Sequence, residues 1–515
     1  MGSEIIINVE PYETRVALLE NRSISEIYIE RTKEKGIAGN IYRGRVTKVL
    51  PGMQVAFVDV GLEKSGFLHK SDINLTEYGI VPDFGKSPDG HEGNDSLLEE
   101  LPNHIAAPKE TPPIEDILQE GQEIMVQVVK DPIGTKGTRI SSFITLPGRY
   151  LVFMPLAAQI GVSRRIEDQA ERERLKRLVD ELRSPAHGFI VRTAAEGVTR
   201  EELKRDIDFL SRMWETIQAK NERAKAPSLI HRDLDIVLRS LRDLCGREVD
   251  RVVIDSPEDF QRSVEFMNTV IGEAHAAIEL YRGGEPIFEG YGLELEIERA
   301  LGRKVWLKSG GYIVIDQTEA LTTIDVNTGK FVGKRNQEET ILKTNLEAVK
   351  EIVYQLKLRN LGGIIIIDFI DMEKEPSKEK VYKTLEQALK TDRSRTNIMR
   401  VSELGLVEMT RKRTRESLAK VLCQPCPHCE GKGLMKSPKT VCYEIFREIE
   451  RATRKKPNAK KILLEVPPRI AAALYEEEND YLERLESERQ FKFKIRVIKE
   501  MPDEEYEVTV MDYNG

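Results

Sequence analysis

The sequence predicts a multidomain protein that combines α/β domains with an all-β barrel. The chain has 515 residues, which is too long for one hydrophobic core at about 100–200 residues per domain. Residues 37–145 contain short strand patterns broken by glycine, as in a small barrel of OB type. Strand and helix periodicities alternate after residue 300, as in an α/β sheet.

Composition excludes several classes of protein. Hydrophobic residues make up 40% of the chain and charged residues 32%, which suits ordinary globular cores. The longest aliphatic run, residues 364–367, is far shorter than the roughly 18 residues of a membrane span. The N-terminus has an early acid and no apolar signal core, so we expect a cytoplasmic protein. A net charge of −8 limits any nucleic-acid site to local basic patches.

The first elements are all predicted strands. Residues 4–9, 15–19 and 26–31 form a sheet with too little core to stand alone, and residues 251–254 predict a later strand that could join it. The barrel strands follow at residues 43–50, 54–60, 66–69, 124–130 and 139–142. Residues 82–113 hold six prolines and predict a flexible insertion.

Helices and strands alternate in the remaining parts of the chain. After the barrel we expect a strand at 150–154, a charged helix around Leu175, a strand at 188–192 and a helix from about Arg200. The C-terminal part predicts a small α/β domain with helices at 441–452 and 469–485 and strands at 461–466, 493–498 and 506–511. Cys245 and Cys442 are typical of ordinary buried cysteines.

A β-α-β unit between residues 312 and 368 carries the most informative pattern. Residues 312–318 and 320–326 alternate as strands, with Asp325 and Asn327 on one face. Residues 338–358 show a helical apolar stripe, and residues 364–368 form an apolar run typical of a strand buried on both faces. A crossover of this kind makes its two strands parallel.

Parallel strands end at the same edge of a sheet, so Asp325 and Asp368 should lie close together if their strands are neighbours. Two like charges at the end of apolar strands are costly unless a cation binds them. Mg²⁺ takes one or two carboxylates and keeps waters and phosphate oxygens as its other ligands, and Asn327 could orient one carboxylate. The alternative is that each aspartate only caps the next turn.

The strings 324–329 (IDVNTG), 367–372 (IDFIDM) and 426–431 (CPHCEG) closely resemble the ribonuclease E/G family. The resemblance spans essentially the whole chain, and the chain has the length of the shorter members without a long C-terminal scaffold. It implies a Mg²⁺-dependent endoribonuclease that cuts single-stranded, AU-rich RNA in RNA processing and decay and leaves 5′-phosphate and 3′-hydroxyl ends. Family catalytic positions fall on Asp325, Asp368 and Asn327.

The resemblance also implies three RNA-binding sites. In the barrel, an S1-type module, Phe57 and Phe67 match aromatics that stack on bases, and Lys130 and Lys136 match neighbouring basic positions; the alternative for Phe57 is a core residue. A pocket for a 5′-monophosphate falls on Gly148, Val152, Arg192 and Thr193. Arg395 matches a phosphate contact, whereas the basic run 411–415 is typical of a solvated helix face.

Cys426 and Cys429 supply two thiolates, and structural zinc takes four ligands. The remaining ligands could be Cys423 and His428 of the same chain or the same pair from another subunit. The resemblance favours a Zn²⁺ shared across a homodimer, with pairing of dimers into a tetramer left open.

By resemblance, the domains are a ribonuclease H-like domain (1–36 and 237–300), an S1-type barrel (37–145), a 5′-phosphate sensor (146–236), a DNase I-like catalytic domain (301–422), a zinc-link (423–438) and a small C-terminal domain (439–515). Two other functions remain open. The chain could be an RNA-binding scaffold without catalysis, or a metal phosphohydrolase acting on small nucleotides, for which a stacking platform would have no use.

Overall fold

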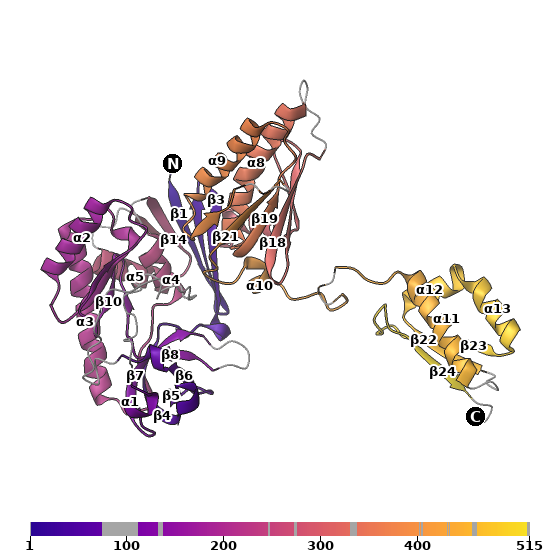
Figure 1. Cartoon of the computed structure of the whole chain (residues 1–515), viewed down its shortest axis with the longest axis horizontal. Helices are drawn as coiled ribbons and strands as arrows, with labels where there is room; N and C mark the ends of the chain where they lie inside the picture. The colour runs from indigo at the N-terminus through magenta and orange to yellow at the C-terminus, as the bar shows by residue number, and fades with distance from the viewer. Residues whose placement is uncertain are drawn as a thin grey trace. The chain divides into compact units, whose positions relative to one another are not determined.

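The computed structural model describes residues 2–74, 112–131, 137–245, 248–271, 276–329, 337–400, 402, 405–429, 431, 433–455 and 461–511. The chain forms two compact units, Met1–Val421 and Leu422–Gly515 (Figure 1). The larger unit contains four sheets and the smaller unit one, counted over these residues. No helix in the described ranges is long and apolar enough to cross a membrane.

The N-terminal strands join a sheet that is completed much later in the chain. The strand order is β15-β14-β1-β2-β3. The strand β1 pairs in parallel with β14, with Ile5 opposite Val252, which confirms that residues 251–254 join the first strands (Figure 1). The helices α4 and α5 belong to this part of the chain. Bounds are β1 (Ser3–Val9), β2 (Glu13–Glu20), β3 (Ser23–Arg31), α4 (Ile236–Leu244), β14 (Val249–Ile254), α5 (Pro257–Phe266) and β15 (Ala277–Leu280).

Five strands close into the predicted barrel. They follow the order β4-β5-β6-β8-β7, and β4 also pairs with β7 to close the ring. A sixth strand, β13, adds to the outside of β4 and was not predicted. Residues 82–111 of the predicted insertion lie outside the described residues. Bounds are β4 (Ile41–Leu50), β5 (Val55–Asp59), β6 (Gly66–His69), α1 (Ile114–Ile117), β7 (Glu123–Lys130), β8 (Arg139–Ser141) and β13 (Ser228–His231).

The part of the chain that follows the barrel and precedes α4 forms a small sheet, which packs against two long helices, α2 and α3. Its order is β11-β12-β10-β9. The carboxylate of Asp206, fully buried on α3, accepts hydrogen bonds from three consecutive backbone N–H groups, those of residues 149–151. This contact fixes the loop before β10. Bounds are β9 (Leu146–Pro147), β10 (Leu151–Met154), β11 (Ile160–Val162), α2 (Gln169–Leu182), β12 (Gly188–Val191) and α3 (Arg200–Arg223).

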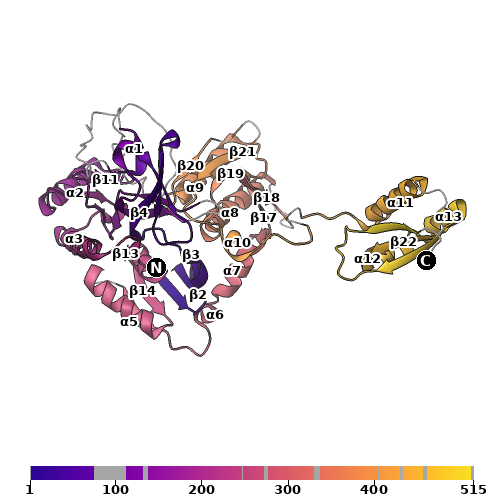
Figure 2. The ribbon, with the colours of Figure 1, turned by 90° about the horizontal axis from the view of Figure 1, so that it is seen from below.

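The last sheet of the larger unit contains the predicted β-α-β unit. Its order is β16-β17-β18-β19-β21-β20, and α8 and α9 share one core with one of its faces (Figure 1, Figure 2). Bounds are α6 (Ile287–Gly290), α7 (Leu293–Leu301), β16 (Lys304–Trp306), β17 (Tyr312–Gln317), β18 (Leu321–Asn327), α8 (Gln337–Leu358), β19 (Gly363–Asp368), α9 (Glu375–Leu389), β20 (Thr396–Ile398), β21 (Leu406–Arg411) and α10 (Leu418–Leu422).

The prediction that residues 364–368 are buried on both faces is wrong. Ile365 and Ile367 are fully buried against the helices, but Ile364 on the opposite face is 51% exposed. The reason is that α8 and α9 both pack on the same face. We call the other face, which carries Ile364, Asp325 and Asp368, the open face.

The smaller unit is an α/β domain with strand order β23-β22-β24. The single helix predicted for residues 469–485 is wrong, because α12 ends at Glu476 and α13 starts at Asn479. The acidic residues 476–478 oppose the negative C-terminal end of a helix, so a break there is favoured. Bounds are α11 (Pro438–Lys455), β22 (Lys461–Val466), α12 (Pro468–Glu476), α13 (Asn479–Arg489), β23 (Lys492–Val497) and β24 (Glu507–Met511).

Candidate active site

Two carboxylates meet on the open face, as predicted. The strands β18 and β19 are parallel neighbours, and Asp325 lies directly opposite Asp368 in their register. Both side chains are exposed. The side-chain amide of Asn327 donates a hydrogen bond of 2.7 Å to Asp325 Oδ2, which fixes the orientation of that carboxylate. The crossover and the period of two were sufficient to predict this arrangement.

The local electrostatics favour a cation at this position. Partial burial, together with the negative charges of Asp325 and Asp371, raises the pKa of Asp368 above its ordinary value. The structure shows no ion pair for any of these three carboxylates within the described ranges. Their repulsion is therefore uncompensated by protein cations there, and a bound metal ion would relieve it.

The donor set suits a metal ion that needs few protein ligands. Among the described residues, no group of three or more His, Cys, Asp or Glu side chains is placed to hold a metal. Two opposed carboxylates remain, Asp325 and Asp368, and Mg²⁺ binds through one or two carboxylates while it retains waters and substrate phosphate oxygens. The residues present therefore fit Mg²⁺ better than an ion that requires a full protein cage.

A buried asparagine, which the sequence analysis missed, supports the site from α8. The Asn345 side chain is fully buried, donates to the carbonyl oxygen of Ile370 at 2.8 Å and accepts from its N–H at 3.1 Å. These bonds fix the chain that follows Asp368 and leads into Asp371. The sequence did contain a signal for this residue, an amide within the apolar stripe of a predicted helix. A buried polar side chain is normally hydrogen-bonded, so such an amide indicates a specific partner.

The aromatic pair of the barrel is on its outer surface. Phe57 and Phe67 are cross-strand partners on β5 and β6, with ring centroids 6.2 Å apart and planes at 75°. Both are only partly buried, while their neighbours Ala56 and Leu68 belong to the barrel core, so the core alternative for Phe57 is wrong. Partly exposed, edge-to-face rings form a surface on which a base can stack.

A basic residue continues this row across the barrel. Phe67 pairs with Arg139, and Arg139 pairs with Lys130 at the end of β7, where the Lys130 side chain is exposed. Lys136, the other predicted contact, lies outside the described residues. The structure therefore brings three of the four predicted barrel residues, Phe57, Phe67 and Lys130, into one strip.

The predicted phosphate pocket is only partly assembled. Arg192 Nη1 donates to the carbonyl oxygen of Gly148 at 2.7 Å and to Asp243 Oδ1 at 2.9 Å. The Thr193 hydroxyl lies 3.1 Å from that of Ser163. Val152 is buried on β10 and packs against Ile190 rather than lining an open pocket.

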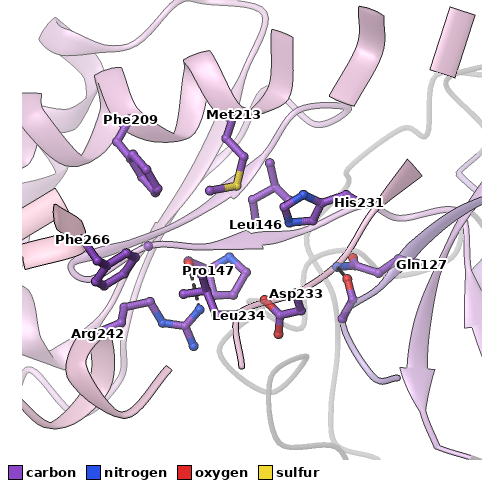
Figure 3. Close-up of a pocket in the computed structure, with 12 residues that line it drawn as sticks. Gln127, Leu146, Pro147, Phe209, Met213, His231, Asp233, Leu234, Arg242 and Phe266 are labelled. Atoms are coloured by element: carbon purple, nitrogen blue, oxygen red, sulfur yellow. Dashed lines mark hydrogen bonds between the residues drawn. The ribbon is translucent and has the colours of Figure 1, made fainter. Parts of the chain in front are cut away.

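A second arginine, Arg242, holds the residue that precedes Gly148. Arg242 donates to the carbonyl oxygen of Pro147 at 3.1 Å (Figure 3). It is also paired with Asp243 at 2.9 Å. Asp243 thus bridges Arg192 and Arg242. The arginine that the resemblance assigns to a 5′-phosphate already has a carboxylate partner in the free chain.

The basic run 411–415 is structural, and its interpretation as a solvated helix face is wrong. Arg411 is the last residue of β21 and forms a buried ion pair with Asp392 at 2.7 Å. Arg413 Nε donates to the carbonyl oxygen of Gly362 at 2.9 Å, and the Arg415 guanidinium lies 3.6 Å from the Tyr28 ring centroid. The predicted phosphate contact, Arg395, is exposed.

The cysteine segment presents three free thiols rather than a complete zinc site. Cys423 and Cys426 are exposed and Cys429 is partly buried. Backbone N–H groups of Cys429 and His428 donate to the Cys426 sulfur and lower its pKa, which favours the thiolate that zinc binds. Cys423 and His428 do not complete a local ligand group in the described part of the chain. Cys245 and Cys442 are buried, as predicted.

The fold and the site define a mixed α/β protein with a closed five-stranded barrel and a pair of adjacent carboxylates. The model of the ribonuclease E/G family matches residues 145–414, and that of the RNase E/G thioredoxin-like domain matches residues 425–511. Ribonuclease G of Salmonella typhimurium (strain SL1344) is 47% identical over 99% of this chain and 100% of its own length. The chain belongs to the ribonuclease E/G family.

Other relatives agree with this assignment. Ribonuclease G of Escherichia coli (strain K12) is 46% identical over 99% of this chain and 100% of its own length. Ribonuclease E of the same strain is 36% identical over 95% of this chain but only 44% of its own length. The expected resemblance to the family, with the layout of ribonuclease G, is confirmed.

Proposed function

We propose that the chain is a Mg²⁺-dependent endoribonuclease that cuts single-stranded, AU-rich RNA and leaves 5′-phosphate and 3′-hydroxyl ends. It is an endoribonuclease, a hydrolase of phosphodiester bonds that acts in RNA processing. The observation that carries the proposal is the cross-strand pair of Asp325 and Asp368, exposed on one face and without a cationic partner within the described residues.

The chain's own residues prepare the site for this reaction. Asp325 and Asp368 would hold the cation between them, while Asn327 keeps the Asp325 carboxylate in one orientation through its 2.7 Å hydrogen bond. When bound, Mg²⁺ supplies an activated water and neutralises charge on the phosphate. Attack of water on phosphorus with departure of the 3′ oxygen gives the proposed ends. No protein nucleophile is needed.

The experiment is cleavage of 5′-labelled single-stranded RNA by the purified chain with Mg²⁺ or with chelator, followed by mapping of the product ends. Asp325→Asn and Asp368→Asn should each abolish cleavage but retain RNA binding. Asp316→Asn is the matched control, because Asp316 is on neighbouring β17 and pairs with Arg303. Full activity in either site variant would contradict the assignment. Tight RNA binding without any product, unaffected by chelator, would instead support the non-catalytic scaffold.

We also propose that the barrel grips the RNA through Phe57, Phe67, Lys130 and Lys136, with Arg395 as a further phosphate contact. One base–aromatic stack is worth about 1–3 kcal/mol, and it tolerates any base. Phe57→Ala and Phe67→Ala should therefore weaken RNA affinity about 5- to 150-fold. Unchanged affinity in both variants would exclude the platform.

A 5′-monophosphate should stimulate cleavage through the site at Gly148, Val152, Arg192 and Thr193. What supports this is the hydrogen bond from the Arg192 guanidinium to the Gly148 carbonyl oxygen, together with Thr193 as the next residue of the chain. Arginine is suited to bidentate binding of a phosphate. RNA with a 5′-monophosphate should be cut faster than RNA with a 5′-triphosphate or hydroxyl, and equal rates would refute the proposal.

Cys426 and Cys429 should bind a structural Zn²⁺ together with the same pair from a second chain, which gives a homodimer. The lowered pKa of Cys426 and the lack of a complete local ligand group among the described residues support a shared site. Four ligands per ion predict about half a zinc per chain and a dimeric native mass. About one zinc per chain in a monomer would support a local site instead.

A further inference from the structure

An aromatic and cationic cluster lies on the open face beside the two carboxylates. It consists of Lys304 and Trp306 on β16 and Tyr312 on β17. The Trp306 and Tyr312 ring centroids are 5.3 Å apart with planes at 65°. Lys304 Nζ lies 4.1 Å from the Trp306 centroid and 3.5 Å from the Tyr312 centroid. The cluster is therefore a pair of rings with one ammonium group held against both.

The strand register places the cluster next to the catalytic residues. Tyr312 pairs with Trp306 on one side and with Asn327 on the other, so the three residues form one row across the sheet. Lys304 pairs with Val314, and Val314 pairs with Asp325, in the next row on the same face. Neighbouring strands are about 4.8 Å apart, so Trp306 is about 10 Å from Asn327.

Packing within the described residues does not account for the cluster. The Trp306 side chain is 62% exposed although tryptophan is among the largest apolar side chains. The helices α8 and α9 pack on the opposite face, and the buried residues of their core do not include Trp306 or Tyr312. The exposed indole and the neighbouring cation are on the same face of the sheet as the carboxylates. This combination suits the binding of an anionic polymer that carries flat aromatic groups.

We propose that Trp306 and Tyr312 form a stacking site for one unpaired nucleobase of the RNA, and that Lys304 contacts an adjacent phosphate. The base is within about three nucleotides of the cut bond, because about 10 Å corresponds to three steps of ~3.4 Å between stacked bases. This inference rests on the proposed endoribonuclease function and adds a subsite to it. It makes Trp306 a substrate-binding residue, separate from the barrel platform.

Intrinsic fluorescence tests the contact directly. The chain has two tryptophans, and the other, Trp214, is only 3% exposed on α3. A single-stranded RNA oligonucleotide, added in the presence of chelator to prevent cleavage, should quench the Trp306 emission. The quenching should be absent in Trp306→Ala. An abasic position introduced within three nucleotides of the cleavage site should remove the quenching, whereas abasic positions further away should not.

Kinetics give a second readout. Trp306→Ala should raise KM about 5- to 150-fold with little change in kcat, and Trp306→Phe should restore most of the affinity because it keeps a ring. Lys304→Gln should reduce the slope of log affinity against log salt by about 0.7. Tyr475→Ala is the control, since Tyr475 is 57% exposed on α12 of the smaller unit, and its KM should not change.

The outcomes separate this inference from the proposed function. Cleavage by the wild-type chain together with no quenching and an unchanged KM in Trp306→Ala would overturn the inference and leave the endoribonuclease intact. Emission that depends on protein concentration and not on RNA would assign the face to a second copy of the chain, and would also overturn it. If the wild-type chain itself does not cleave RNA, the result would count against the proposed function instead.

Discussion

The substitution Asn345→Ala tests whether α8 positions the segment that follows Asp368, which is part of the proposed active site. In the structure the Asn345 amide makes two hydrogen bonds to the backbone of Ile370, at 2.8 and 3.1 Å. Each bond contributes about 0.5–1.5 kcal/mol net, and each backbone group left unsatisfied costs about 1–3 kcal/mol. Two unsatisfied groups are therefore expected to lower the free energy of unfolding of this domain by about 2–6 kcal/mol in Asn345→Ala.

In Asn345→Ala, kcat should fall by more than the loss of stability alone explains. Ile370 is two residues after Asp368, and a displacement of about 1 Å near a reacting group can lower the rate about 100-fold. We expect kcat to fall about 10- to 100-fold, a higher Mg²⁺ concentration for half-maximal rate, and a nearly unchanged KM. The assay is steady-state cleavage of a short single-stranded RNA over a Mg²⁺ series, below the onset of thermal unfolding.

Val349→Ala is the matched control. Val349 is fully buried one turn further along α8 and contributes to the same core, so its truncation creates a cavity without removing a hydrogen bond to the loop. It should destabilise the domain but leave kcat within about twofold of the wild type. An equal fall in kcat for both variants, or none for Asn345→Ala while it is folded, would refute the positioning role.

Three further predictions follow from the charges. Asp371→Asn removes one of the charges that raise the pKa of Asp368, so the pKa of Asp368 should fall. A metal-binding carboxylate loses its charge as pH falls through its pKa. The acid limb of the kcat/KM profile should therefore move to lower pH. Asp243→Asn removes the carboxylate partner of Arg192 and should increase the ratio of rates on 5′-monophosphorylated and 5′-hydroxyl RNA; an unchanged ratio would contradict this. Cys426→Ser should abolish zinc binding and reduce the native mass to that of one chain, and a zinc-free dimer would contradict it.

Local periodicity predicted the central part of this fold well. The period of two on β18, the helical stripe of α8 and the handed crossover were enough to place Asp325 beside Asp368. The barrel strands were also predictable, because glycine and turn residues delimit them. What periodicity could not supply was the side of the sheet on which α9 packs. For that reason the burial of Ile364 was predicted incorrectly.

Long-range partners account for the other differences. The run 411–415 contains four cations, and sequence composition alone suggested a solvated face. Arg411 is instead buried because Asp392, nineteen positions earlier, neutralises it. Trp306 is a further case, since its significance depends on a register that aligns β16 and β17 with Asn327. No local pattern encodes such pairings.

The pairing of β1 with β14 has a consequence for synthesis of the chain. Until residue 254 has emerged from the ribosome, β1 has β2 on one side and an unpaired edge on the other. At ~5–20 residues per second this interval lasts roughly 10–50 s. Exposed strand edges invite pairing with other chains. The N-terminal strands of the nascent chain should therefore be a preferred target for chaperones. Fragments that end before β14 should aggregate.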